Sequence, residues 1–92
     1  MAKGKTDYKL LARTFRVFGD QNRLRILAAL RQGELNVTEL CTKLKLRQPA
    51  VSHHLGILRY GGMVDSRRDG KQVFYRLKRP LAAMRKLLRD FI

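Results

Sequence analysis

Residues 36–60 constrain the fold more than any other part of the chain, because they hold two short amphipathic segments only a few residues apart. Asn36 followed by Glu39 is a capping-box arrangement, and it predicts a helix that begins near Val37. The apolar positions that follow are three and four residues apart, which is the helical period. The chain then leaves this helix through residues 45–47, so the connection to the next segment is very short.

The second segment divides into two faces with helical spacing. The face that must point inward carries Val51, Leu55 and Leu58. The opposite face carries Pro49, His53, Gly56 and Tyr60, with Gln48 and Ser52 at its leading edge. Pro49 suits the first turn of a helix, where a missing N–H costs nothing. Two short helices, the second with polar residues facing outward, are typical of a helix-turn-helix whose second helix enters a DNA major groove.

A basic hairpin is predicted directly after this helix. Gly61 and Gly62 end the helix, and the hydrophobic period changes from 3.6 to 2 in MVDSRRDGKQVFYRL. Asp69-Gly70 is a dipeptide favoured in type I′ turns, so two strands joined at this point are expected. The cations Arg67, Arg68 and Lys71, with Arg76 as a weaker candidate, cluster near the tip. Such a hairpin is typical of a wing that contacts phosphates or an adjacent minor groove.

Three further helices complete the expected order. The first covers about 7–18 and ends at Gly19; the second begins after an Asp20 N-cap, looks mostly buried, and is closed by Gly33 as a left-handed C-cap. A last helix covers about 80–92. The 92 residues therefore predict one winged helix-turn-helix domain, mainly α with a β-hairpin, in the order α-α-α-α-β-β-α.

The charge of the chain indicates its partner. Lys and Arg number 21 against 7 Asp and Glu, giving a net charge of +14, which favours a polyanion and double-stranded DNA before a membrane. No apolar run approaches the roughly 18 residues of a membrane span, and the N-terminal segment lacks the long apolar stretch of a secretory signal. We therefore expect a soluble cytoplasmic protein associated with the nucleoid.

Three motifs together resemble one family. FGDQNRLRILAAL, LNVTELCTKL and LRQPAVSHHLGILRYGGMVDSRRDGKQVFYRL are similar, in order and spacing, to the ArsR/SmtB family of winged-helix repressors. The resemblance implies a homodimer in which the first and last helices form the interface and two recognition helices bind an imperfect palindrome. The apolar stripes of both terminal helices support the same dimer, and the expected interface residues are Leu10, Leu11, Phe18, Leu81, Met84, Leu88 and Phe91.

The metal sites of that family are not expected here. Many members bind metal through ELCxC in the third helix, whereas this chain has Cys41 but places Lys43 at the second thiolate position. The site on the last helix would retain only Asp90. Cys41, His53 and His54 do not form a site among themselves, because adjacent helical residues point about 100° apart and zinc needs three or four converging ligands. We expect no metal and no cofactor, and we interpret Cys41 as a small buried hydrophobe without a redox partner.

The expected DNA contacts fall into two groups. The recognition-helix group is Arg47, Gln48, Ser52 and His53, and the group on the wing and its flanks is Thr38, Arg67, Arg68 and Lys71. Arg47 replaces the Ser usual at this N-cap in the family, so about 1 kcal/mol of capping is expected to be lost. Tyr60 either contacts a phosphate or covers the start of the wing, and Gly56 leaves an outward position without a side chain. His54 is expected to be structural.

Two functions remain compatible with these residues. The first is a sequence-specific regulator, most simply a repressor that blocks a promoter as a dimer on a palindromic operator. The alternative is an architectural, nucleoid-type protein with little sequence preference. No enzyme is expected, because Ser52 and His53 are neighbours on one helix without a third group to orient them, and no paired carboxylates or phosphate loop occur.

Overall fold

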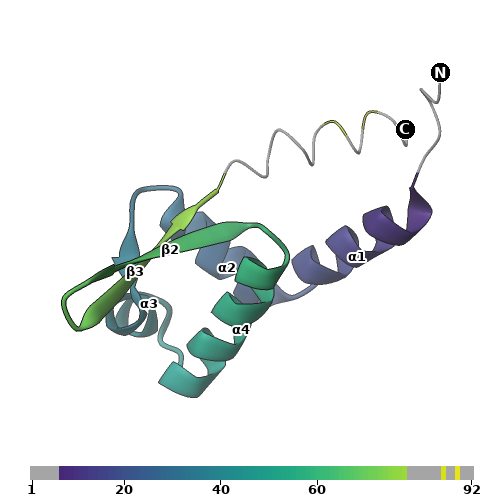
Figure 1. The fold of residues 1–92 in the computed structure, drawn as a ribbon. Helices are drawn as coiled ribbons and strands as arrows, with labels where there is room; N and C mark the ends of the chain where they lie inside the picture. Colours follow the sequence, from purple (N-terminus) through teal and green to yellow (C-terminus); the bar gives the residue numbers. More distant parts are fainter. Residues whose placement is uncertain (1–6, 79–85, 87–88, 90–92) are drawn as a thin grey trace.

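The computed structural model describes residues 7–78, 86 and 89, and its elements follow the predicted order with one additional strand. The helices and strands are α1 (Tyr8–Phe18), α2 (Gln21–Leu30), β1 (Leu35–Asn36), α3 (Val37–Leu44), α4 (Gln48–Tyr60), β2 (Val64–Asp69) and β3 (Gln72–Leu77). Helices α2, α3 and α4 pack together against a three-stranded sheet, and α1 projects away from this body (Figure 1). Four helices with antiparallel strands confirm the predicted fold class. The predicted last helix lies outside the described residues except for Lys86 and Arg89, which are helical and exposed.

The start of α2 was predicted correctly, but its end was not. The Asp20 carboxylate accepts the backbone N–H groups of Asn22 (2.8 Å) and Arg23 (3.1 Å), as an N-cap should. The helix ends at Leu30, however, and its C-cap is Arg31 in the right-handed conformation. Gly33 lies beyond the cap in the following turn, with a φ of 145°. The prediction that Gly33 closes this helix as a left-handed C-cap was therefore wrong, because the helix ends before Gly33.

Burial of α2 is also less complete than expected. One stripe of the helix enters the core through Ile26, Ala29 and Leu30, whereas Leu24 is 48% exposed. Leu24 belongs to a second surface, an apolar groove of about 210 Å³. This groove is lined by Phe18, Leu24, Leu27, Ala28, Arg31, Met63 and Leu77. The prediction of a mostly buried helix was wrong, because apolar spacing identifies a face but not what covers it.

Helix α3 has the predicted cap. The Asn36 side chain accepts the N–H of Glu39 (2.7 Å), and the Glu39 carboxylate accepts the N–H of Asn36 (2.9 Å), so the capping box is complete. The helix ends at Leu44, and its C-cap, Lys45, adopts the left-handed conformation with a φ of 56°. This conformation turns the chain out of α3 and into the short connection before α4.

The two faces of α4 are those that the spacing predicted. Val51, Leu55 and Leu58 have at most 1% of their surface exposed and form the centre of the core with Ile26 and Leu40. The predicted outward residues are all exposed, namely Gln48, Pro49, Ser52, His53, Gly56 and Tyr60. The buried face fixes the rotation of α4, so its polar face must point away from the core.

The sheet differs from the predicted two-stranded hairpin in two respects. A short strand, β1, pairs with β3 through Leu35 and Tyr75, so the order of strands is β1-β3-β2. The predicted Asp69-Gly70 turn was displaced by one residue, because Asp69 pairs with Gln72 and leaves Gly70 and Lys71 as the two central residues. Only Gly70 has a positive φ, at 65°. A type II′ turn requires this at its first central residue, whereas type I′ requires it at both.

Candidate nucleic-acid interface

The outward face of α4 presents its polar side chains on a continuous surface. Ser52 and His53 are exposed one turn after Gln48, and the opposite side of the helix is locked into the core. Gln48, Ser52 and His53 offer both donors and acceptors, which is what hydrogen bonding to base edges requires. The spacing of the core residues is therefore what positions these three groups.

Arg47 precedes this face and does not cap α4. Its backbone has extended N-cap geometry, with φ −78° and ψ 151°, and its side chain makes no capping hydrogen bond. The predicted absence of side-chain capping at this position is confirmed. The exposed guanidinium lies beside the first turn of α4, where it is available to an anion.

A groove brings together predicted residues from three separate elements. It has a volume of about 410 Å³ and is lined by Asn36, Val37, Thr38, Glu39, Gln48, Lys71, Gln72 and Val73. Thr38 comes from α3, Gln48 from α4 and Lys71 from the hairpin turn. We call this surface the wing groove. The Asn36 amide donates to the Gln72 side chain (2.7 Å), which connects the start of α3 to the wing across this groove.

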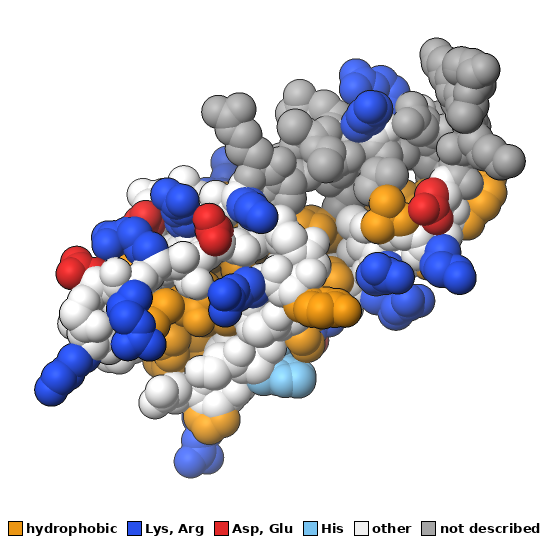
Figure 2. Space-filling view, in the orientation of Figure 1, with side chains coloured by type: hydrophobic (Ala, Val, Ile, Leu, Met, Phe, Trp, Pro, Cys, Tyr) orange, Lys and Arg blue, Asp and Glu red, His pale blue; other side chains and the backbone are white. Residues whose placement is uncertain are grey.

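The cations of the wing are divided between two faces of the hairpin. Arg67 lies opposite Phe74, and its guanidinium stacks 4.9 Å from the centroid of that ring. Its Nε donates to Glu34 (2.8 Å), and its Nη1 lies 3.7 Å from Asp69, so two carboxylates already neutralise it. Figure 2 shows this mixture of basic and acidic side chains over the hairpin.

Arg68 and Lys71 have a different environment. Successive strand residues point to opposite faces, so Arg68 lies on the other side of the sheet from Arg67 and opposite Val73. Neither Arg68 nor Lys71 forms an ion pair with any residue that the structure describes. Arg76 pairs with Asp65 (3.3 Å). Hydrogen bonds to the Asp65 carboxylate, first from the Ser66 backbone N–H and second from Arg76, hold its pKa below the ordinary value. Arg68 and Lys71 are therefore the wing cations with unneutralised charge.

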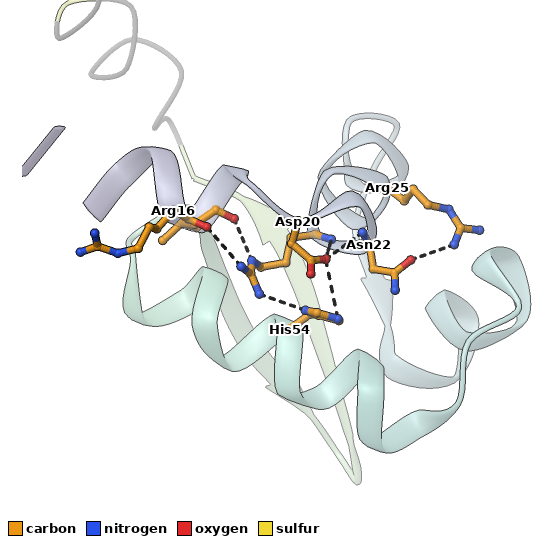
Figure 3. Close-up of polar contacts among 7 residues, drawn as sticks. Arg16, Asp20, Asn22, Arg25 and His54 are labelled. Carbon is orange, nitrogen blue, oxygen red and sulfur yellow. Dashed lines mark hydrogen bonds and ion pairs between the residues drawn. The ribbon is translucent and has the colours of Figure 1, made fainter. Parts of the chain in front are cut away.

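His54 lies beside the core and connects α4 to the junction of α1 and α2, as Figure 3 shows. Its Nδ1 is 3.2 Å from Nη1 of Arg23, and its Nε2 is 3.9 Å from the Asp20 carboxylate. Arg23 also donates to the carbonyls of Val17 (2.8 Å) and Arg16 (3.2 Å) at the end of α1. The predicted structural role of His54 agrees with these contacts. The participation of Arg23 was not predicted, because the partners of its side chain lie on two other elements, α1 and α4.

Cys41 is half-buried and packs against the hydrophobic core, in agreement with the structural interpretation of this residue. Within residues 7–78 and at 86 and 89, no three His, Cys, Asp or Glu side chains lie close enough together to hold a metal ion. In the same part of the chain, no helix is long and apolar enough to cross a membrane.

The predicted dimer residues on α1 have unequal exposure. Leu10 is 42% exposed, whereas Leu11 is only 3% exposed within the single chain. Phe18 is half-buried and lines the apolar groove. Phe15, which the sequence reasoning omitted, is also an exposed large hydrophobic residue. The other predicted interface residues, Leu81, Met84, Leu88 and Phe91, lie outside the described residues.

The fold and the exposed polar face of α4 define a winged helix-turn-helix regulatory protein. A model of the arsR family of bacterial regulatory proteins matches residues 20–66, which contain α2, α3, α4 and the start of the wing. The chain belongs to this family.

Three relatives illustrate the similarity. The biofilm growth-associated repressor of Agrobacterium fabrum is 45% identical over 83 residues, covering 90% of this chain and 68% of that protein. The solved structure of reduced HlyU from Vibrio cholerae has a TM-score of 0.75 and 35% identity, over 91% of this chain and 90% of that chain. The homodimeric winged helix-turn-helix domain of Mb0332 from Mycobacterium bovis has a TM-score of 0.76 and 30% identity, over 89% and 77% of the two chains. These relatives are regulators, not enzymes, in agreement with the non-enzymatic prediction.

Proposed function

We propose that this protein is a sequence-specific transcriptional repressor that binds a palindromic operator as a homodimer, acting on the nucleoid in the cytoplasm. The observation that carries this proposal is the wing groove beside the outward face of α4. Thr38, Gln48 and Lys71 converge there from α3, α4 and the hairpin. A groove between a recognition helix and a basic wing has the form needed to hold one strand of a duplex.

The residues divide into base-reading and phosphate-binding groups. Gln48 can donate to and accept from an adenine edge, and Ser52 and His53 can each form a hydrogen bond to a base or phosphate. Arg47, Arg68 and Lys71 are exposed cations around this polar centre. Phosphate contacts fix the register of the protein on the duplex, whereas the polar centre discriminates between sequences.

The homodimer is supported by the apolar surface of the single chain. Leu10 and Phe15 are exposed on α1, and the apolar groove exposes Leu24 nearby in the chain. Large apolar side chains that are exposed on a helix or line an open groove are typical of an interface. The Mycobacterium bovis neighbour is described as homodimeric. A two-fold dimer presents two recognition helices symmetrically, and this symmetry is what a palindromic operator matches.

Repression is the direction that the relatives favour. The relatives from Agrobacterium fabrum, Escherichia coli and Synechocystis are named repressors, whereas HlyU of Vibrio cholerae is named a transcriptional activator. A dimer bound across a promoter blocks access to it without needing a further contact. We therefore propose repression by occupancy of the operator.

Selection of genomic DNA fragments by the purified protein tests this function. At about 150 mM salt, binding driven by phosphates alone is already weak. The expected result is one palindromic motif with half-sites about one helical turn apart. The Gln48→Ala variant should change the preferred bases, whereas Lys71→Gln should weaken all sequences alike. Recovery of fragments without a shared motif would replace this proposal with the architectural alternative.

A further inference from the structure

The C-terminal half of α4 carries an exposed surface depression outside the base-reading and phosphate-binding groups of the proposed function. It has a volume of about 490 Å³ and is lined by Gly56, Arg59 and Tyr60. We call these three residues the Gly56 patch. Gly56 lies one helical turn after Ser52, so the patch continues the outward face along which Gln48, Ser52 and His53 are arranged.

The fold of the described residues does not need a glycine at position 56. A Cβ atom built there has no atom within 4 Å, and the backbone does not have a positive φ. Glycine inside a helix is less favourable than alanine because the unfolded chain loses more conformational freedom. Three other glycines also have no atom within 4 Å of an added Cβ. These are Gly33, Gly62 and Gly70, and all three have positive φ values that favour glycine. Gly56 therefore reduces the stability of α4 without a steric reason inside the chain.

The neighbours of Gly56 indicate what approaches it. The side chain of Arg59 is exposed and forms no hydrogen bond or ion pair with a described residue, and Tyr60 is 91% exposed. A guanidinium and a phenolic hydroxyl are both donors to phosphate oxygens. The chain also has a net charge of +14, which opposes the approach of a second basic surface and favours a polyanion.

We propose that the sugar-phosphate backbone of the bound duplex lies against the Gly56 patch. The missing side chain lets the DNA backbone approach the helix closely, and Arg59 and Tyr60 donate to phosphates on either side of the point of contact. The contact is independent of sequence, so the patch adds affinity and fixes the depth of α4 in the major groove. This inference rests on the proposed function for its partner, double-stranded DNA.

The experiment compares variants on two duplexes of equal length, one with the selected motif and one of random sequence. Gly56→Ala should raise the melting temperature by roughly 2–8 °C, since it removes the helix penalty of glycine. It should also weaken binding to both duplexes by about threefold or more, because phosphate contacts carry no base information. Gly56→Gln should weaken binding further. Stability and affinity that move in opposite directions would not arise from a purely structural role.

Two further variants separate the donors. Arg59→Gln should make the dependence of log affinity on log salt less steep by about 0.9. Tyr60→Phe should weaken binding without changing this slope. Lys43→Gln is the control for the loss of one positive charge, because Lys43 is exposed at the end of α3 and lines neither the wing groove, the apolar groove nor the Gly56 patch. It should leave binding unchanged.

Two results would overturn the inference. One is binding by Gly56→Ala and Gly56→Gln equal to that of the parent protein. The other is a changed association state of these variants in sedimentation, which would place the patch between two copies of the chain. Failure of the proposed function would be seen in a different experiment, in which the parent protein selects genomic fragments that share no motif. The random duplex at low salt would still test the patch in that case.

Discussion

Replacement of Arg47 by serine should raise the thermal stability of the protein and lower its affinity for DNA. Arg47 already has the backbone conformation of an N-cap, so a serine there needs no rearrangement. Its hydroxyl would accept a hydrogen bond from the second or third residue of the helix. The second residue is Pro49, which has no N–H. The serine hydroxyl must therefore accept its hydrogen bond from the backbone N–H of Ala50, the third residue.

The expected magnitudes follow from this geometry. A serine cap is worth about 1 kcal/mol relative to a residue that cannot cap. For a domain of this size, that gain corresponds to a rise of roughly 4–8 °C in melting temperature. Under the proposed function, loss of the Arg47 charge should remove one phosphate contact. DNA binding should weaken, and its salt dependence should become less steep by about 0.9.

Arg47→Ala is the matched control for both effects. It removes the same charge but supplies no acceptor, so it should lose DNA affinity without gaining thermal stability. Calorimetry and fluorescence anisotropy with a labelled duplex measure the two quantities on the same preparations. If Arg47→Ser bound DNA as tightly as the parent protein, Arg47 would be excluded from the interface. An unchanged melting temperature would refute the capping argument.

Three other predictions test the core, the Asp20 cap and the wing. Leu58→Ala should lower the free energy of unfolding in urea by about 2–5 kcal/mol, since Leu58 is fully buried; a loss typical of a surface site would contradict the assigned core. The pKa of Asp20 is lowered from 3.8, chiefly because its carboxylate accepts the Arg23 backbone N–H. The unfolded chain therefore binds the proton more tightly, and this contribution to stability, present above pH 3.8, is lost as the pH falls below it. Asp20→Asn keeps a capping oxygen and should flatten that part of the stability–pH curve; an unchanged curve would show that Asp20 is not responsible. Arg68→Gln should lower DNA affinity and its salt slope more than Arg67→Gln, because Glu34 and Asp69 neutralise Arg67; equal losses in anisotropy titrations would contradict this division.

Local patterns in the sequence were sufficient for most of the fold. The capping box at Asn36, the helical spacing of the α4 core and the paired glycines after it each specify structure through neighbours in the chain. Strand β1 could not be predicted in this way. It has only two residues, and it exists because Leu35 and Asn36 pair with Tyr75 and Phe74 at the far end of the sequence.

The candidate site was predictable in its composition but not in its electrostatics. The exposed residues of α4 follow from the position of its buried face. The neutralisation of Arg67 depends on Glu34, which is 33 residues away and meets the wing only after the sheet has formed. Strand alternation was a signal that could have helped, because Arg67 and Arg68 are adjacent in a strand and must point to opposite faces. Their clustering in the sequence concealed that only one of them has unneutralised charge.

The arrangement of charge has a consequence for how the proposed operator is recognised. The centre of the α4 face is formed by Gln48, Ser52 and His53, whereas the unneutralised cations Arg68 and Lys71 lie on the wing beside it. Salt competes with contacts between cations and phosphates, and these contacts are the same on every sequence. Added salt should therefore weaken specific and non-specific binding by similar factors and leave their ratio nearly unchanged. With a net charge of +14, the protein would bind most DNA tightly at low salt, so specific and non-specific duplexes would both be saturated in a titration. The preference carried by the α4 face can be measured in such a titration only when salt partly screens phosphate binding.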